Sequence, residues 1–212
     1  MPEVKFLFDF GSPNAYLSHK AIPQIEARTG VRFDYAPILL GGVFKLTGNQ
    51  SPALAFAGIR NKLAYENLET RRFVARHGLA AFRMNPHFPV NTLQIMRGAV
   101  AAQALGVFEP YVEQVFADMW ERGLKMDDPQ VMRQALADGG LPVEELLAAS
   151  ASDEIKARLV ANTEAAVEAG VFGAPSFLVG SELFFGKDRL GAVEEEILRQ
   201  SVPARGLIGA AS

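Results

Sequence analysis

Strand-forming segments lie only near the two ends of this chain of 212 residues. Residues 4–10, 31–38 and 176–185 contain aromatic and β-branched side chains in strand-like patterns. Between residues 51 and 170 the sequence instead repeats the start and stop signals of helices. A single sheet therefore forms only if the two ends of the chain meet, with a long helical segment inserted between them.

The N-terminal segment has the pattern of a strand, a helix and a second strand. Residues 4–10 alternate between two faces, as a strand does. Ser12 is a preferred helix N-cap and Pro13 suits the first helical position, so a helix begins here. Gly30 follows the end of its apolar pattern, and residues 31–38 form the second strand. The expected result is a βαβ unit with a right-handed crossover.

The C-terminal segment returns to strands. Residues 176–179 and 182–185 are predicted to pair as a hairpin around the Gly180–Ser181 turn, and a last helix follows from about Leu190. A βαβ unit and a ββα unit around a helical block predict an α/β, thioredoxin-like fold that is split by a large all-helical insertion.

This pattern also predicts two domains. Residues 1–40 and 171–212 together form the thioredoxin-like domain, and residues 41–170 form the helical insertion domain. Within the insertion, the first helix is predicted to begin at Ser51–Pro52 and to end near Gly78. Further helices are predicted around Asn91, Tyr111, Asp128, Pro142 and Ser152.

Composition excludes several classes of function. The formal net charge is -3 and the Lys and Arg residues are dispersed, so nucleic acid is not an expected partner. No apolar stretch approaches the ~20 residues of a membrane helix, and the N-terminus lacks the features of a signal peptide, so we expect a cytoplasmic protein that does not bind membranes. The three histidines lack metal-ligand spacing, and no metal site is expected.

The chain contains no cysteine, which excludes disulfides and every cysteine nucleophile. Ser12 nevertheless stands where a helix N-terminus presents free N–H groups and about half a positive charge, which stabilise a nearby anion such as a thiolate. Two interpretations of Ser12 stay open at this point: a simple helix cap, or a residue that holds an anion.

Three motifs resemble one enzyme family. The segments FDFGSPNAYL (residues 8–17), VFGAPSF (171–177) and FFGKDRL (184–190) look like those of the 2-hydroxychromene-2-carboxylate isomerases. These enzymes are related to kappa-class glutathione transferases and to DsbA oxidoreductases. The similarity spans nearly the whole chain, and it implies a thioredoxin-like fold of the DsbA and kappa-class type with glutathione as cofactor.

The resemblance implies roles for residues at the thiol end of glutathione. Ser12 would donate a hydrogen bond to the glutathione sulfur and hold it as a thiolate. The Ala174–Pro175 bond would be cis and would lie opposite the Gly11–Ser12 turn, where the backbone of Ala174 would pair with the cysteinyl unit. Lys45 would reach the glycyl carboxylate or a substrate acid, although an ordinary solvated lysine is the alternative.

At the other end of glutathione, Asp188 would grip the γ-glutamyl group together with the backbone of Gly186 and Lys187. Relatives often have an uncharged polar residue in place of Lys187, so its side chain is not expected to touch glutathione. A ligand-binding asparagine of the family has no clear counterpart here, because Asn49 and Asn61 are both imperfectly placed.

The substrate side of the family resembles the loop before the second predicted helix of the insertion. The residues predicted to bind substrate are Asn85, His87, Phe88 and Asn91. The implied partners are glutathione and a small aromatic carboxylate, and the family further implies a homodimer.

Together these features predict a glutathione-dependent isomerase that interconverts 2-hydroxychromene-2-carboxylate and its open-chain hydroxybenzylidenepyruvate isomer by reversible thiolate addition. A kappa-like glutathione transferase or peroxidase is the first alternative, and a non-catalytic peptide-binding adaptor is the second. A dithiol oxidase is excluded by the absence of cysteine. A serine hydrolase is disfavoured because G-x-S-x-G is absent.

Overall fold

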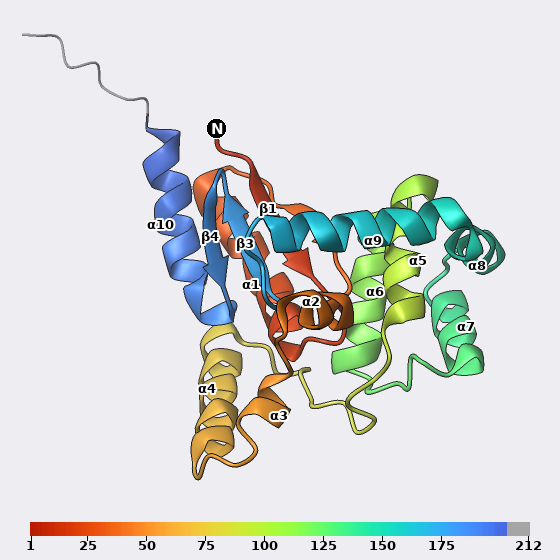
Figure 1. Cartoon of the computed structure of the whole chain (residues 1–212), viewed down its shortest axis with the longest axis horizontal. Helices are drawn as coiled ribbons and strands as arrows, with labels where there is room; N and C mark the ends of the chain where they lie inside the picture. The colour runs from red at the N-terminus through yellow and green to blue at the C-terminus, as the bar shows by residue number, and fades with distance from the viewer. Residues whose placement is uncertain (203–212) are drawn as a thin grey trace, which may run out of the picture.

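In the computed structural model, which describes residues 1–202, the two ends of the chain meet in one four-stranded sheet. The strand order is β2-β1-β3-β4 (Figure 1). The strand bounds are β1 Val4–Phe8, β2 Asp34–Pro37, β3 Ser176–Val179 and β4 Glu182–Phe185. Strand β1 pairs parallel with β2 and antiparallel with β3. The predicted βαβ unit and C-terminal hairpin are confirmed.

Helix α1 (Pro13–Thr29) joins β1 to β2 and packs against α10 (Leu190–Ser201). Its N-cap is Ser12, and it ends at Gly30, whose φ of 71° places it in the left-handed region that glycine favours. A short 3-10 helix, η1 (Lys187–Arg189), connects β4 to α10. Both predicted boundaries of α1 are thus confirmed.

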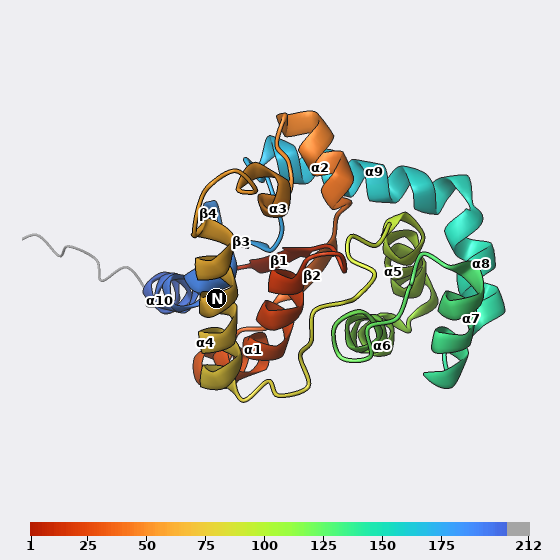
Figure 2. The same ribbon diagram turned by 90° about the horizontal axis from the view of Figure 1, so that it is seen from below.

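Eight helices lie between β2 and β3 in the described part of the chain. They are α2 (Leu40–Thr47), α3 (Pro52–Ala55), α4 (Lys62–His77), α5 (Leu93–Leu105), α6 (Phe108–Trp120), α7 (Pro129–Asp138), α8 (Val143–Ala151) and α9 (Asp153–Glu168). Helices α5 to α8 gather on the side away from α10, and α9 leads back from them to the sheet (Figures 1 and 2). Helices α3 and α4 lie at a different edge, near α1 and the end of β4 that leads into η1 (Figure 1).

The structure corrects the prediction of one helix from residue 51 to residue 78. Helix α3 ends at Ala55, and α4 begins only at Lys62. The residue before α4 is Asn61, whose φ of 70° is incompatible with a continuous α-helix. Residues 56–61 therefore form turns, and the Lys62 ammonium lies 4.9 Å from the centre of the Phe56 ring across this break.

Sequence analysis also missed α2. Two consecutive glycines, Gly41 and Gly42, weaken its helical signal. Its N-cap, Leu39, has no side chain that accepts a hydrogen bond. The helix is capped from elsewhere in the chain, because the Leu40 N–H donates to Asp9 Oδ2 at 2.7 Å.

One apolar cluster runs from the sheet into α5 and α6. Phe8 and Phe10 pack on Phe116 with ring centroids 5.5 and 4.8 Å apart. Trp120 is fully buried, and its indole N–H donates to the Phe10 carbonyl at 2.8 Å. This cluster joins residues before position 41 to residues after it. The division of the chain into two domains at residues 41 and 170 therefore stays a prediction.

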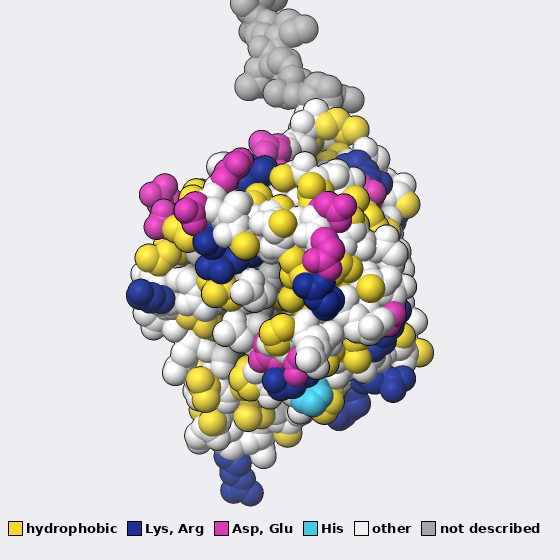
Figure 3. Space-filling view, turned by 90° about the vertical axis from the view of Figure 1, so that its right-hand side faces the viewer, with side chains coloured by type: hydrophobic (Ala, Val, Ile, Leu, Met, Phe, Trp, Pro, Cys, Tyr) yellow, Lys and Arg dark blue, Asp and Glu magenta, His cyan; other side chains and the backbone are white. Residues whose placement is uncertain are grey.

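On the face that α7 and α8 present, acidic, basic and apolar side chains are interspersed (Figure 3). Among residues 1–202, no helix combines the length and the apolar character needed to cross a bilayer.

We expect Gly98→Ala to destabilise the fold, because Gly98 lies where α5 meets α6. A Cβ at this position would fall on the Tyr111 hydroxyl and 2.8 Å from Tyr111 Cζ. Tyr111 is buried and donates to the Ile95 carbonyl at 2.9 Å, so it cannot swing aside freely. Overpacking of this kind costs about 1–3 kcal/mol, more than the ~1 kcal/mol that alanine gains in helix propensity.

Urea unfolding followed by circular dichroism measures this difference. The matched control is Gly191→Ala on α10, where an added Cβ meets no atom within 4 Å. The control should leave stability unchanged or raise it by up to about 1 kcal/mol. Equal stability of the two variants would contradict the packing of α5 on α6.

Candidate functional site

Ser12 lies at the N-terminus of α1, in the turn that leaves β1. Its Oγ accepts a hydrogen bond from the Ala15 N–H at 3.2 Å, as a helix N-cap does. The same hydroxyl donates to the Ala174 carbonyl at 2.9 Å. Ser12 is 5% exposed, so its hydroxyl lies in a nearly dry contact between two turns.

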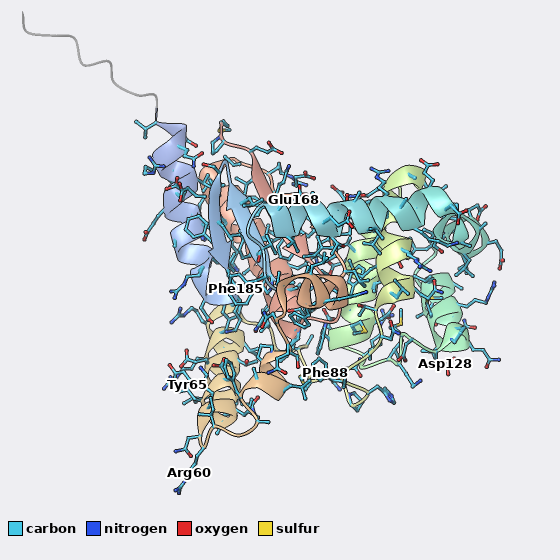
Figure 4. The ribbon with its side chains drawn as sticks, in the orientation of Figure 1. Arg60, Tyr65, Phe88, Asp128, Glu168 and Phe185 are labelled. Carbon is cyan, nitrogen blue, oxygen red and sulfur yellow. The ribbon has the colours of Figure 1, made fainter. Side chains whose placement is uncertain are left out.

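The facing turn is the proline loop before β3. The Ala174–Pro175 bond is cis and lies opposite the Gly11–Ser12 turn, as predicted. The loop is held by the Gly186 N–H, which donates to the Pro175 carbonyl at 2.9 Å. Phe185, labelled in Figure 4 at the end of β4, packs its ring 4.6 Å from that of Phe172 at the start of this loop. The proline loop is thus fixed from both sides.

A buried carboxylate lies beneath the Ser12 turn. Asp9 is fully buried, and its Oδ1 accepts from the Gly11 N–H at 2.8 Å. Its Oδ2 accepts from the Leu40 N–H at 2.7 Å and from the Thr92 hydroxyl at 3.1 Å. Burial raises the pKa of Asp9, and the three hydrogen bonds oppose that rise.

Helix α2 carries Lys45, the cation predicted to bind a carboxylate. Lys45 lies in the last turn of α2 and is exposed. Just beyond this helix, the Asn49 side-chain amide donates to the Phe172 carbonyl at 2.8 Å. Of the two asparagines considered from sequence, Asn49 therefore contacts the proline loop, whereas Asn61 lies in the left-handed turn before α4.

Lys187 and Asp188 lie in η1, directly after the hairpin. The Lys187 ammonium is 2.8 and 3.0 Å from the two carboxylate oxygens of Asp188, and it lies 5.5 Å from the centre of the Phe73 ring. The Lys187 side chain is only 3% exposed, whereas that of Asp188 is 63% exposed. The carboxylate of this pair is therefore accessible to solvent, whereas the ammonium is not.

A cleft of about 540 Å³ opens beside this ion pair, between α1, α4 and α10. Its lining includes Lys187, Asp188, Phe73 and the ion pair of Arg28 with Glu194. The carboxylate of Asp188 therefore faces a space that admits a small polar group.

Asn85, predicted to bind substrate, is buried and holds the loop together instead. Its side-chain N–H groups donate to the carbonyls of Met119 and Leu124, both at 2.9 Å. Its side-chain oxygen accepts from the His87 N–H at 2.8 Å. These bonds use both amide hydrogens and one acceptor site of the oxygen, so Asn85 is held within the loop, whereas His87 is exposed.

The rest of this loop also contains both buried and exposed side chains. Phe88, labelled in Figure 4, is half-buried against Trp120 with ring centroids 6.1 Å apart. Its bond to Pro89 is cis, which sequence analysis did not predict. Asn91 is exposed and accepts from the Leu93 N–H at 3.1 Å. The next residue, Thr92, contacts Asp9, so this end of the loop reaches the Ser12 turn.

A small thiol peptide fits this arrangement of groups. An anion at Ser12 would meet the N-terminus of a helix of 17 residues, and the proline loop offers backbone groups beside it. Lys45 supplies an exposed cation on α2, and Asp188 supplies an exposed anion in η1. A peptide with a free amino group and a carboxylate at its two ends complements these charges.

Comparison with known proteins identifies the family of this chain. The family model of the DSBA-like thioredoxin domain matches residues 3–198. The chain belongs to the DsbA-like thioredoxin domain family. Unlike a dithiol oxidase, this DsbA-like chain has serine at the helix start and no cysteine at all.

Two relatives are enzymes that match most of the chain. A 2-hydroxychromene-2-carboxylate isomerase of Pseudomonas putida is 28% identical over 200 residues, which cover 92% of this chain and 94% of the relative. Human glutathione S-transferase kappa 1 is 25% identical over 205 residues, which cover 88% and 87% of the two chains. A solved structure of a 2-hydroxychromene-2-carboxylate isomerase superposes with a TM-score of 0.79 at 26% identity, covering 93% of this chain and 95% of the other.

Sequence analysis missed Asp9 and Thr92 as parts of the site. A single charged residue at the end of an apolar strand was the available signal for Asp9. Nothing in the local sequence indicates Thr92, because its role depends on a contact across 83 positions.

We expect Asn85→Ala to lower the free energy of unfolding by about 1–3 kcal/mol, because it leaves the carbonyls of Met119 in α6 and of Leu124 after α6 without their partner. The matched control is His87→Ala, which removes an exposed side chain from the same loop and should change stability by no more than about 0.5 kcal/mol. Denaturant unfolding of both variants checks this. Equal losses would show that Asn85 does not anchor the loop.

Proposed function

We propose that this protein is a glutathione-dependent isomerase that interconverts 2-hydroxychromene-2-carboxylate and its open-chain hydroxybenzylidenepyruvate isomer. The observation that carries the proposal is the contact of Ser12 with the proline loop in a chain without cysteine. The helix start and the cis-proline loop form a place for a thiolate, and the chain has no thiol of its own. The 28% identical isomerase of Pseudomonas putida supports this choice of reaction.

Ser12 would bind the glutathione sulfur. Its hydroxyl hydrogen rotates about the Cβ–O bond, so it can turn from the Ala174 carbonyl to a sulfur placed beside the two turns. Its oxygen still accepts from Ala15 after this rotation, and the α1 N-terminus adds its positive dipole. All three features favour the charged form of the thiol.

The remaining binding groups would orient the peptide. The backbone of Ala174 beside cis-Pro175 would pair with the cysteinyl unit, and Lys45 would bind the glycyl carboxylate. Asp188 would bind the γ-glutamyl ammonium with the backbone of Gly186 and Lys187, while the buried Lys187 ammonium keeps the Asp188 carboxylate in place.

Bound glutathione would supply a nucleophilic thiolate that adds reversibly to the conjugated double bond of the substrate, so that the resulting single bond can rotate before the thiolate leaves. His87 and Asn91 are the exposed members of the predicted substrate side, and Phe88 offers part of an aromatic face. These residues would orient the aromatic carboxylate, whereas Asn85 would act only by holding their loop. We further propose that the protein works as a cytoplasmic homodimer.

A kappa-like glutathione transferase is the second candidate, favoured by the 25% identity to human glutathione S-transferase kappa 1. The same site would bind glutathione, but the thiol would be consumed.

We expect Ser12→Ala to fold and to lose most activity. A hydrogen bond to a charged group contributes roughly 1.5–3 kcal/mol, so the loss corresponds to about a 10- to 150-fold weaker stabilisation of the thiolate. A pH titration of the thiolate ultraviolet absorbance of bound glutathione measures it. The thiol pKa should rise by about 1–2 units in the variant.

Ser51→Ala is the matched control, because Ser51 also caps a helix that begins with proline. It should cost stability of about 1 kcal/mol at most and leave the thiol pKa unchanged. A Ser12→Ala variant with full turnover and an unchanged thiol pKa would reduce Ser12 to a helix cap.

The reaction is tested by following the two substrate isomers with catalytic amounts of glutathione and counting free thiol before and after. The isomerase proposal expects turnover that requires glutathione and leaves the thiol count constant. Stoichiometric loss of thiol would move the assignment to a transferase, and no binding of glutathione in a calorimetric titration would leave the adaptor.

A further inference from the structure

Asp9 is a fully buried carboxylate with no role in the function proposed above. It follows β1 directly and lies three positions before Ser12. Its backbone carbonyl accepts from the Ser12 N–H at 3.0 Å, and its side chain accepts from the Gly11 N–H at 2.8 Å. The turn that carries Ser12 is therefore bonded to Asp9 by both its backbone and its side chain.

The same carboxylate holds two further elements against this turn. Leu40 begins α2, the helix that carries Lys45, and Thr92 is the N-cap of α5 at the end of the predicted substrate loop. Thr92 makes no side-chain cap for its own helix, and its hydroxyl donates to Asp9. Three parts of the candidate site thus converge on one side chain.

The packing around the carboxylate is tight. A Cβ at Gly11 would lie 3.0 Å from Thr92 Cγ2 and 3.3 Å from Asp9 Oδ1. The carboxylate therefore has a fixed position next to the residue that precedes Ser12. Within residues 1–202, the groups bonded to it are the N–H groups of Gly11 and Leu40 and the Thr92 hydroxyl, none of which carries a formal charge.

An ionised Asp9 would repel a second anion held at Ser12. Asp9 is fully buried and Ser12 is 5% exposed, so little solvent screens this repulsion. Ser12 and the α1 dipole act in the opposite direction, since both favour the thiolate. The ionisation of a bound thiol would then depend on the balance of these groups.

We propose that Asp9 is a positioning residue for the thiolate of bound glutathione, which holds the Ser12 turn through its hydrogen bonds and opposes ionisation of the thiol through its charge. This inference rests on the proposed use of glutathione. A thiol whose pKa stays near the ambient pH is the best compromise between attack and departure, and a reversible addition needs both.

The test is a pH titration of the thiolate absorbance of glutathione bound to the wild type and to Asp9→Asn. Asparagine keeps the shape of the side chain, removes its charge and replaces one acceptor oxygen by an NH2 group. Loss of the charge should lower the thiol pKa by on the order of one unit. The acid limb of kcat/KM should move to lower pH by the same amount. Simple damage to the turn would move the thiol pKa upward instead, because it would weaken the bonds that favour the thiolate.

Gly11→Ala is the matched control for geometry, because its added Cβ displaces the Thr92 and Asp9 side chains without changing the charge. It should lower the thiol pKa by less than Asp9→Asn does, because the carboxylate charge stays in place. S-methylglutathione, which has no ionisable thiol, controls for the pocket, and its affinity should differ by less than about threefold between the wild type and Asp9→Asn.

An unchanged or raised thiol pKa in Asp9→Asn overturns the inference, as does a loss of S-methylglutathione binding. If Asp9→Asn does not fold, Thr92→Val replaces it. This variant removes a donor that favours the charged form of Asp9, so the thiol pKa should fall in the same direction by less, and a rise or no change overturns the inference. Failure of the wild type to bind glutathione would refute the proposed function itself, whereas normal binding with an unshifted thiol pKa would refute only the role of Asp9.

Discussion

A hydrogen bond between two turns 162 positions apart holds the candidate site together: the Ser12 hydroxyl donates to the Ala174 carbonyl. The bond forms only because β1 pairs with β3, which brings the two ends of the chain into one sheet. The helical segment can therefore vary in length and packing without moving these turns, provided that it returns the chain to β3. The site thus depends on the sheet, and the helices supply what surrounds it.

Buried polar groups attach the helical segment to this sheet. Trp120 donates to the Phe10 carbonyl, and Thr92 donates to the Asp9 carboxylate. A buried polar group without a partner costs about 1–3 kcal/mol, so each bond disfavours arrangements in which the helices lie elsewhere. Apolar packing alone would allow the helices to shift over the sheet, whereas these bonds are directional. They explain how a loop of the insertion reaches the Ser12 turn at a defined place.

The order of secondary structure elements could be predicted from the sequence, because local signals fix it. Ser12 and Gly30 bound α1, and Asp128 and Ser152 cap α7 and α9, each by a side chain or a left-handed turn within the element itself. The helix α2 could not be predicted in this way, since its cap is Asp9, 31 positions away. The sequence motifs predicted that Ser12 lies opposite the proline loop. They could not predict that Asn85 and Lys187 are buried, because burial depends on the neighbours that folding brings to these residues.

Helix α1, which begins at Ser12, is also held by polar contacts with α6. The His19 ring lies between the Tyr35 hydroxyl, 2.9 Å from Nδ1, and the Glu113 carboxylate, 2.7 Å from Nε2. Hydrogen bonds from His19 and Lys20 lower the pKa of Glu113 to about 2, so this carboxylate is charged at neutral pH. On α6 it bonds the side chains of both His19 and Lys20 on α1. The helix whose N-terminus would stabilise a thiolate is thus fixed at Ser12 by the proline loop and two turns later by the insertion, which keeps its dipole aimed at one point.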